Sequence, residues 1–557
     1  MGLRRRLRGL ILRIAALGGG AAGALVATDH RAGLSPGDGA LLVIAGALAA
    51  ACEAGLAALL LSALARLWRR GRSAPAPEPG RAPGARLLDG LGLALLGLLA
   101  LSSERRADRG DPAGDRGPSV WLVTLDTLRA DHVSAIGGGR RRVPTPNLDA
   151  LAARCTLFTR GVSPAPLTLP SHAAMLTGQH PMALGVLRNG VRLPPEVETV
   201  ADATAPGRAA AFVSSSILSR ATGLDRGFAR YDDTFGVAGL LSLLPQLGPV
   251  LRALDLAPHQ RTADQTLAEL RRWRSGEARG GEFIWVHLYD PHAPYEAPEG
   301  YRGLTPWDTP DAPGGPTDMR AARAEIRERR ELFMPMVPLD LRRTVAAYAD
   351  EVRWTDAALG QILALTGPGD RLIVAADHGE SLIEHGALLT HGSQVFETTT
   401  RVPIIACFPD PDAPRTVDEP APLEAIGVTL RSWLTHGARA PGGLEDYLAP
   451  AEGRPPLLSL AGEMQSRDQP MIAHGWELAL RDGEVKWLSG RDGVLRRFLP
   501  ATDPGERVDT APEQDPDARA AMMEEFARIR LHLDALQATR ATDADQSDAL
   551  RALGYVE

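Results

Sequence analysis

The segment from 166 to 181, PLTLPSHAAMLTGQHP, carries the clearest chemical signal in this chain. Thr168 lies just before Pro170, which is typical of a helix start, and Gly178 is typical of a helix end. A side chain at that start faces unpaired N–H groups and the positive end of the helix dipole, which suits a negatively charged oxygen. Because a threonine alkoxide needs stronger stabilisation than this, the segment predicts a nucleophile beside a metal ion.

Candidate metal ligands follow the predicted strands. One strand ends in Asp126, a second ends in Asp377 followed by His378, and a third carries the sequence HLYDPH. In open α/β sheets, ligands gather outside the carboxyl ends of the strands. A single strand-end aspartate is often only a helix cap, but these three residues together with Thr168 predict one cation site. Thr168 is expected to be its fourth ligand.

The elements that position these residues alternate between strand and helix from residue 119 onward. The predicted strands are 120–126, 209–214, 283–290, 371–377 and 402–408. The predicted helices are 147–155, 170–177, 262–274 and 341–365. Near-continuous apolar strands separated by helices predict an α/β fold with a mainly parallel central sheet flanked by helices.

The pattern changes after residue 454. Short alternating segments at 476–480, 485–488 and 494–499 are joined by Asp-Gly turns, and a helix is expected at about 515–536. These features predict a small C-terminal antiparallel subdomain plus a helix. We therefore divide the chain into a linker (103–118), a catalytic domain (119–453) and a C-terminal subdomain (454–557).

The first 102 residues predict a transmembrane region of about three helices. Apolar runs lie at 14–28, 40–67 and 87–101, and a crossing needs about 20 mainly apolar residues. Arginines cluster before the first run and between the second and third, so the positive-inside rule places everything after residue 101 outside. A cleaved signal peptide is the alternative for the first run. If the third run does not cross, the catalytic part would be cytoplasmic.

We accordingly expect a multi-pass protein of the cell (inner) membrane, with its catalytic domain on the periplasmic or extracellular side. The formal net charge of −7 is modest and basic residues crowd around the apolar N-terminus, so no nucleic-acid partner is expected. Three cysteines are too few and too scattered to predict a disulfide framework. Cys155 and Cys407 are therefore expected to be ordinary packing residues.

Several motifs follow one another in an order that is highly specific. They are DTLRAD, TPNLDALA, TLPSHAAMLTG, HLYDPHAPY, DHGESLIEHGALLTHG and RVPII. With this set, the chain from about 119 to 557 resembles the sulfatase-like branch of the alkaline-phosphatase superfamily. The resemblance implies a sandwich with a central sheet. It also implies that Asp126, Asp377 and His378 are metal ligands, and that Thr168 is the nucleophile and touches the metal.

The resemblance implies further roles around the nucleophile. His292 and His391 match positions that contact the transferred group or protonate the leaving oxygen. His172 takes the place of the arginine in the C-x-P-x-R signature of sulfatases. Arg188 and Asn189 lie where related chains place residues near the substrate. We therefore take His292 and His391 as catalytic candidates and the other three as substrate-binding candidates.

Two alternatives concern the HLYDPH segment. The first is a second cation bound by Asp290, His292 and His391, which is less favoured than a single cation. His287 is expected on the opposite face from a strand neighbour, and a structural role is favoured for it.

The chain departs from sulfatases in three places. Thr168 cannot yield the formylglycine aldehyde that sulfatases make from Cys or Ser. Thr127 replaces the second aspartate of arylsulfatases, and His378 replaces an asparagine that is common in calcium-dependent members. Because imidazole suits Mn²⁺ and Zn²⁺, these ions are favoured over Ca²⁺ or Mg²⁺.

Unmodified threonine nucleophiles occur in relatives such as phosphoethanolamine transferases and lipoteichoic-acid synthases, which also carry N-terminal membrane domains. The sequence therefore predicts a metal-dependent hydrolase or transferase acting on phosphate, phosphonate or sulfate esters. The substrate is a small molecule, a glycan or a lipid-linked ester. The alternative is a catalytically inactive membrane protein with this fold and a binding or structural role.

Overall fold

In the computed structural model, every described residue lies in the unit formed by residues 113–243 and 251–557. The described residues are 117–136, 143–235, 260–276, 278, 280–305, 341–382, 384–385, 389–408, 415–435, 439–450, 453–462, 475–510 and 515–540. The predicted membrane segments 14–28, 40–67 and 87–101 lie outside them. Within the described residues, no helix combines the length and the apolar character that a bilayer crossing requires.

The main sheet has the strand order β4-β3-β5-β1-β6-β7-β2-β8, and β9 also pairs with β2. Its strands are β1 Val120–Leu125, β2 Thr156–Val162, β3 Ala209–Phe212, β4 Arg230–Asp232, β5 Phe283–Leu288, β6 Arg371–Ala376, β7 Arg401–Cys407, β8 Thr416–Val417 and β9 Ala421–Pro422. All pairs are parallel except those that β7 makes with β6 and β2. The prediction of a mainly parallel central sheet is confirmed.

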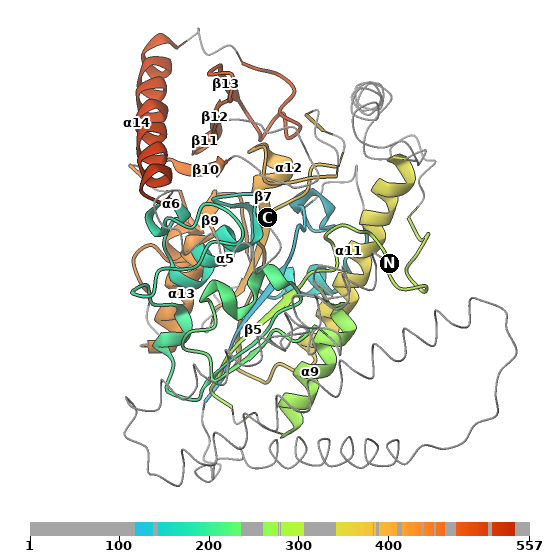
Figure 1. Cartoon of the computed structure of the whole chain (residues 1–557). Coiled ribbons are helices and arrows are strands. Elements are labelled where there is room, and N and C mark those ends of the chain that lie inside the picture. The colour runs from blue at the N-terminus through green and yellow to red at the C-terminus, as the bar shows by residue number, and fades with distance from the viewer. Residues whose placement is uncertain are drawn as a thin grey trace, which may run out of the picture. The chain divides into compact units, whose positions relative to one another are not determined.

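Helices cover the sheet. They are α4 Pro146–Ala152, α5 Thr168–Thr177, α6 Pro181–Leu184, α9 Ala263–Gly276, α11 Leu341–Leu363, α12 Glu397–Thr400 and α13 Glu424–Thr435. Short 3-10 helices occur at Ala130–His132, Val200–Ala203, Ser216–Leu218, Arg220–Thr222 and Leu444–Leu448. Figure 1 shows α5 and α13 on one side of the sheet and α9 and α11 on the other. All six residues of β1 are therefore buried, which explains why its sequence is apolar without alternation.

Helices α5 and α13 approach each other closely where glycines face. A Cβ on Gly427 would lie 2.7 Å from the Met175 carbonyl oxygen and 2.8 Å from the Gly178 Cα. Gly178 ends α5 with φ of 74°, in the left-handed region that favours glycine. This contact fixes α5, the helix that begins at Thr168, against the body of the domain.

A second, antiparallel sheet follows, in the order β10-β11-β12-β13, with α14 Pro516–Arg540 packed on it. The strands are β10 Leu457–Ala461, β11 Glu477–Asp482, β12 Val485–Ser489 and β13 Leu495–Phe498. Phe526, Ile529 and Leu533 of α14 share an apolar cluster with Leu480 and Trp487 of the sheet. The predicted small antiparallel sheet is therefore present, with β10 as a strand that the sequence patterns did not reveal.

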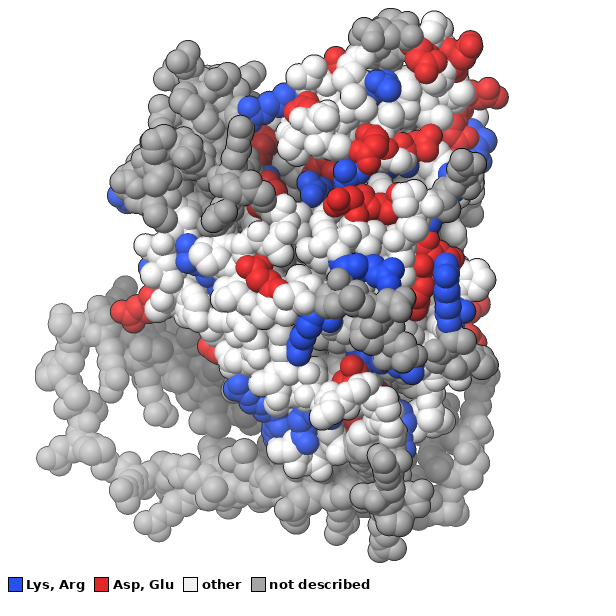
Figure 2. All heavy atoms as spheres, turned by 180° about the vertical axis from the view of Figure 1, so that it is seen from behind, with Lys and Arg blue, Asp and Glu red and all other residues white. Residues whose placement is uncertain are grey.

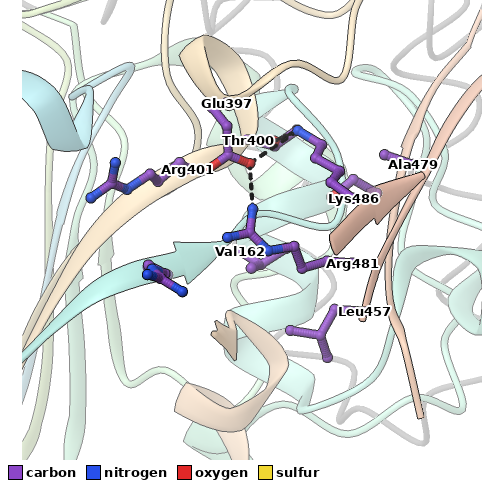
Figure 3. Close-up of a pocket in the computed structure, with 11 residues that line it drawn as sticks. Val162, Glu397, Thr400, Arg401, Leu457, Ala479, Arg481 and Lys486 are labelled. Carbon is purple, nitrogen blue, oxygen red and sulfur yellow. Dashed lines mark hydrogen bonds and ion pairs between the residues drawn. The ribbon is translucent and has the colours of Figure 1, made fainter. Parts of the chain in front are cut away.

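The two sheets meet at a buried ionic cluster, which Figure 3 shows in close-up. Lys486 of β12 binds Glu397 of α12 (Nζ to Oε1, 3.1 Å) and Glu506 (Nζ to Oε1, 2.9 Å). Arg481 of β11 binds the same Glu397 oxygen at 2.8 Å. Burial alone would raise the pKa of Glu397, but the two cations lower it to about 2. Lys486 is the single lysine of the sequence.

The expectation that Cys155 and Cys407 are ordinary packing residues is wrong. They form a disulfide with a Cα–Cα distance of 4.6 Å across 252 positions of sequence. The antiparallel pairing of β2 with β7 places Thr156 opposite Ala406. Cys155 directly precedes Thr156 and Cys407 directly follows Ala406, so the two cysteines are neighbours. Sequence spacing alone hides this, because the two strands become neighbours only in the folded sheet.

Charged side chains are interspersed on the described surface. In the view from behind in Figure 2, basic and acidic side chains are both spread among the other residues of the face. Large apolar side chains that are exposed in the described part are scattered, and include Leu304, Val494 and Leu531.

Candidate active site

Adjacent strands place the two candidate aspartates side by side. Strand β1 pairs in parallel with β6, with Leu125 opposite Ala376, and each strand is followed directly by an aspartate, Asp126 or Asp377. The N–H of Asp126 donates to the Leu288 carbonyl at 2.9 Å, which extends the pairing with β5. Both carboxylates thus emerge at the carboxyl edge of the sheet, where ligands were expected.

The candidate metal ligands meet at this edge. The Nε2 atom of His378 lies 3.4 Å from Asp377 Oδ2 and 3.8 Å from Asp126 Oδ1. Ligand atoms of these three residues lie within 4.8 Å of one another, and the residues are buried. Thr168 Oγ1 lies 3.5 Å from His378 Nε2, so the predicted nucleophile lies beside the same group. The structure therefore brings all four predicted metal-site residues together.

The hydrogen bonding of the two carboxylates fits a bound cation. Asp377 Oδ1 accepts the N–H groups of Thr127 (3.1 Å) and His378 (2.8 Å). Asp377 Oδ2 and Asp126 Oδ1 are buried and accept no hydrogen bond. A buried carboxylate oxygen without a partner is costly, and a divalent cation would satisfy both oxygens. The donor set of two carboxylates, an imidazole and a hydroxyl suits such an ion.

The electrostatics of these residues agree with that fit. Burial raises the pKa of Asp126 to about 8. Burial and then the charge of Asp126 raise the pKa of Asp377 well above its usual range. Burial also lowers the pKa of His378, so its ring is neutral and can act as a ligand. Burial therefore makes it unfavourable for both carboxyl groups to be ionised when no positive charge is near. A bound cation would allow both to be ionised.

Thr168 is the first residue of α5, two residues earlier than the predicted helix start. The next N–H, that of Leu169, donates to Asn189 Oδ1 at 3.0 Å. This hydrogen bond places Asn189 beside the predicted nucleophile. Asn189 is half-buried, whereas the neighbouring Arg188 is exposed. Their substrate-binding roles stay predictions.

His172 lies beneath the first turn of α5. Its Nδ1 donates to the Thr168 carbonyl at 2.7 Å, and its Nε2 accepts from Thr124 Oγ1 at 3.0 Å. Trp285 Nε1 donates to the same Thr124 oxygen at 3.1 Å. With both ring nitrogens engaged and the ring fully buried, His172 supports the helix start. Its predicted contact with substrate gains no support from these contacts.

The ring of His391 lies beside that of His378, the candidate ligand, with ring centroids 4.5 Å apart. Its Nδ1 lies 3.3 Å from Oε1 of Glu380, which is buried. Burial alone would lower the pKa of His391, but Glu380 raises it above its ordinary value. His391 is therefore the imidazole of the site whose surroundings favour the positively charged form.

His292 also lies beside His391, with ring centroids 4.9 Å apart. Its Nδ1 donates to the Ala293 carbonyl at 2.6 Å, and its ring stacks on Tyr289 at 4.3 Å. Burial and then the charge of His391 lower the pKa of His292 to about 3, so this imidazole is neutral. The pKa values of these two histidines, which the sequence treats alike, are therefore shifted in opposite directions.

Sequence reasoning missed two contacts. One is the contact between His391 and Glu380, which is the last residue of the DHGE motif. The other is His287, whose Nε2 lies 3.2 Å from Asp126 Oδ2. The β1–β5 register pairs Thr124 with His287, so the two side chains share a face, and Asp126 has the same parity as Thr124. This register was the missing signal.

The alternative of a second cation at Asp290 also gains no support. Asp290 Oδ1 accepts the N–H groups of Ala263 (3.0 Å) and Trp354 (2.7 Å). Among the described residues, Asp126, Asp377 and His378 form the one group of three or more such side chains close enough to bind an ion together.

Comparison with known proteins identifies the family. The sequence model of the family described as Sulfatase matches residues 118–435. An ulvan-active sulfatase of Formosa agariphila is 38% identical over 80 residues, which are 14% of this chain and 15% of that protein. Human iduronate 2-sulfatase is 25% identical over 381 residues, which cover 60% of this chain and 66% of that protein. The chain thus spans less than two thirds of these two relatives.

A solved structure supports the fold. The phosphonate monoester hydrolase of Agrobacterium radiobacter aligns with a TM-score of 0.56 at 22% identity, covering 75% of this chain and 95% of that one. The resemblance inferred from the ordered motifs is confirmed, because the family match spans more than half of the chain. The chain belongs to the sulfatase family.

Proposed function

We propose that this sulfatase-family chain is a metal-dependent enzyme that cleaves phosphate, phosphonate or sulfate esters with Thr168 as its nucleophile. One observation carries the proposal. The Thr168 hydroxyl lies 3.5 Å from His378 Nε2, at a buried cluster in which two carboxylate oxygens lack hydrogen-bond partners. This arrangement supports a reactive hydroxyl beside a cation.

Asp126, Asp377, His378 and Thr168 would hold the cation. When bound, the cation would lower the pKa of the Thr168 hydroxyl and offset negative charge on the substrate. The nitrogen ligand His378 favours Mn²⁺ or Zn²⁺, with Ca²⁺ or Mg²⁺ as alternatives.

Thr168 begins α5, where the positive end of the helix dipole favours negative charge on its oxygen. In the proposed first step, the Thr168 hydroxyl releases its proton to solvent, and its oxygen forms a bond to phosphorus or sulfur while the bond to the leaving oxygen breaks. The bound group is then covalently attached to Thr168. His172 holds the carbonyl of the same residue, which keeps the hydroxyl in place.

His391 is our candidate for the acid that gives a proton to the leaving oxygen. The nearby Glu380 carboxylate raises the pKa of its ring above the ordinary value, which favours the protonated form that a proton donor requires. His292 is the poorer candidate, because its Nδ1 is bound to a backbone carbonyl and its ring is neutral. We assign His292 to contact with the transferred group.

The second step transfers the group from Thr168 to water or to an acceptor alcohol, and neutral His391 can remove the proton of the incoming oxygen. The chemistry of threonine favours phosphorus over sulfur. Formylglycine enzymes release sulfate with the second hydroxyl of a gem-diol, and threonine has one hydroxyl. Phosphate diesters and phosphonate monoesters are therefore our preferred substrates, as small molecules, glycans or lipid-linked esters.

We further propose that the catalytic unit faces the extracytoplasmic side, anchored by residues 1–102. The Cys155–Cys407 disulfide supports this orientation, because disulfides persist in oxidising compartments and are rare in the cytosol. The arginine distribution around the N-terminal apolar runs points the same way.

Metal analysis and turnover test the function. Purified full-length chain should contain about one Mn²⁺ or Zn²⁺ and should hydrolyse a bis-aryl phosphate or an aryl phosphonate. Thr168→Ala should abolish turnover, and Asn189→Ala, beside the nucleophile, should lower it less. Faster turnover of an aryl sulfate than of the phosphodiester would overturn the preference for phosphorus. If the chain binds no metal and turns over none of the three substrates, the alternative of a catalytically inactive membrane protein is favoured. Threonine at the formylglycine position is the sequence feature that supports this alternative.

A further inference from the structure

The two aspartates of the candidate cation site are held in the same way by different donors. Asp377 Oδ1 accepts hydrogen bonds from two backbone N–H groups, and Asp377 Oδ2 has no hydrogen-bond partner. Asp126 Oδ2 lies 3.2 Å from His287 Nε2, within hydrogen-bond distance, and Asp126 Oδ1 has no hydrogen-bond partner. In both cases one oxygen is anchored and the free oxygen lies near His378 Nε2. The anchor of Asp126 is a side chain, so it can be removed by substitution.

The surroundings of His287 fix which ring nitrogen carries the proton. The backbone N–H of Ser214 lies 3.3 Å from His287 Nδ1 and can only donate, so Nδ1 accepts. In a neutral imidazole the proton then lies on Nε2, which donates it to Asp126 Oδ2. Ser214 Oγ donates to the His287 carbonyl at 2.6 Å and lies 2.7 Å from Thr266 Oγ1, so the Ser214 backbone is itself held.

Strand pairing sets the distance between His287 and Asp126. His287 lies in β5, opposite Thr124 of β1, and the Asp126 N–H donates to the Leu288 carbonyl at 2.9 Å. Both side chains are fully buried, so water cannot replace the hydrogen bond. Loss of the imidazole would leave Asp126 free to rotate within a dry site.

We propose that His287 is a positioning residue for the cation: it anchors Asp126 Oδ2 and so directs Oδ1 to the ion. This inference rests on the proposed function for the presence of the cation. Histidine–carboxylate contacts of this kind behind a metal ligand are worth about 10- to 100-fold in metal affinity. His287 touches no reacting group, so its effect must appear in cation binding before it appears in turnover.

The experiment measures Mn²⁺ affinity of the full-length chain after chelation, from the free Mn²⁺ signal in electron paramagnetic resonance. We expect His287→Phe to weaken Mn²⁺ binding by about 10- to 100-fold. His287→Gln keeps an N–H donor and should recover most of that loss. His132→Phe is the matched control, because it removes another buried imidazole bound to a carboxylate, that of Asp131 at 2.9 Å, outside the cation site. Its Mn²⁺ affinity should equal that of the native chain.

Mn²⁺ affinity of His287→Phe within twofold of the native value, in a folded protein, would overturn the proposal. If that variant does not fold, His287→Asn replaces it, since its shorter amide cannot reach Asp126 while it can still meet the Ser214 N–H. Native affinity in His287→Asn would then overturn the proposal as well. The outcome is separable from the proposed function: a native chain that binds Mn²⁺ without turning over any ester contradicts the function and leaves the positioning role intact.

Discussion

His391 and His292 illustrate how single residues in this site acquire different tasks. They have the same side chain, lie with rings 4.9 Å apart and are both half-buried. Glu380 beside His391 and a backbone carbonyl beside His292 are what separate them. The acid in the proposed mechanism is therefore defined by its neighbour more than by its own type.

Replacing Glu380 tests this assignment. A proton donor works while it is protonated, and Glu380 raises the pKa of His391, so it extends activity toward higher pH. Glu380→Gln should lower that pKa and move the alkaline limb of the kcat/KM profile to lower pH. The measurement is kcat/KM against pH for both proteins, with Glu384→Gln as the control. An unchanged alkaline limb in Glu380→Gln would assign the acid elsewhere.

Metal removal gives a second prediction at this scale. Without the cation, burial raises the pKa of Asp126 to about 8, above its ordinary value near 4. The folded chain then binds more protons than the unfolded one in this window, so the apo protein should lose stability as pH rises from about 4 to about 8. Thermal unfolding of chelated protein should show this decline, and added Mn²⁺ should reverse it most strongly at high pH. A midpoint of the chelated protein that rises with pH across this window would contradict the account.

The residues that sequence reasoning found are those that follow a strand or begin a helix. Asp126, Asp377, His378 and Thr168 can be placed at one edge of a sheet without knowing the strand order. His287 and Glu380 could not be assigned, because their partners depend on strand register and on how a loop folds back over the site.

At the scale of elements, the apolar runs located the strands well. β1, β5 and β6 fall within predicted segments, because strands buried on both faces are apolar throughout. Strand β2 and the short edge strands were missed, since Thr156–Val162 contains polar residues and a glycine at 161. The disulfide was missed with it, because Cys155 gains its partner through the β2–β7 pairing.

The buried ionic cluster at the junction of the two sheets should be essential to stability. Lys486→Met removes the ammonium between Glu397 and Glu506 and leaves buried carboxylates facing each other. Loss of one partner from a buried ion pair costs about 3–5 kcal/mol, which urea unfolding would measure. Arg528→Met is the control, because Arg528 pairs with Glu525 on the surface, and no measurable change is expected. Equal stability of the two variants would contradict this role.

Because Lys486 is the only lysine, it also reports on the junction directly. Its side chain is 3% exposed in the ion pair with Glu397. An amine-reactive reagent should therefore leave Lys486 unmodified in the native chain and label it after denaturation, as peptide mass spectrometry would show. Rapid labelling of the native chain would mean that the two sheets separate.

At the scale of the whole molecule, the disulfide and the N-terminal apolar runs make one joint prediction. In cells, Cys155 and Cys407 should be oxidised, and alkylation before and after reduction should show one disulfide per chain. Reduction should lower the unfolding free energy by about 2–4 kcal/mol. Free thiols in freshly prepared protein would place the catalytic unit in a reducing compartment and contradict the proposed orientation.

The central claim is that Thr168 forms a covalent bond to the transferred group. The most direct measurement is mass spectrometry of the chain quenched in acid during turnover of an aryl phosphonate or a bis-aryl phosphate. The account predicts an added mass equal to the transferred group, on the peptide that contains Thr168, and no adduct in Thr168→Ala. Turnover without any adduct on Thr168, or an adduct on another residue, would contradict it.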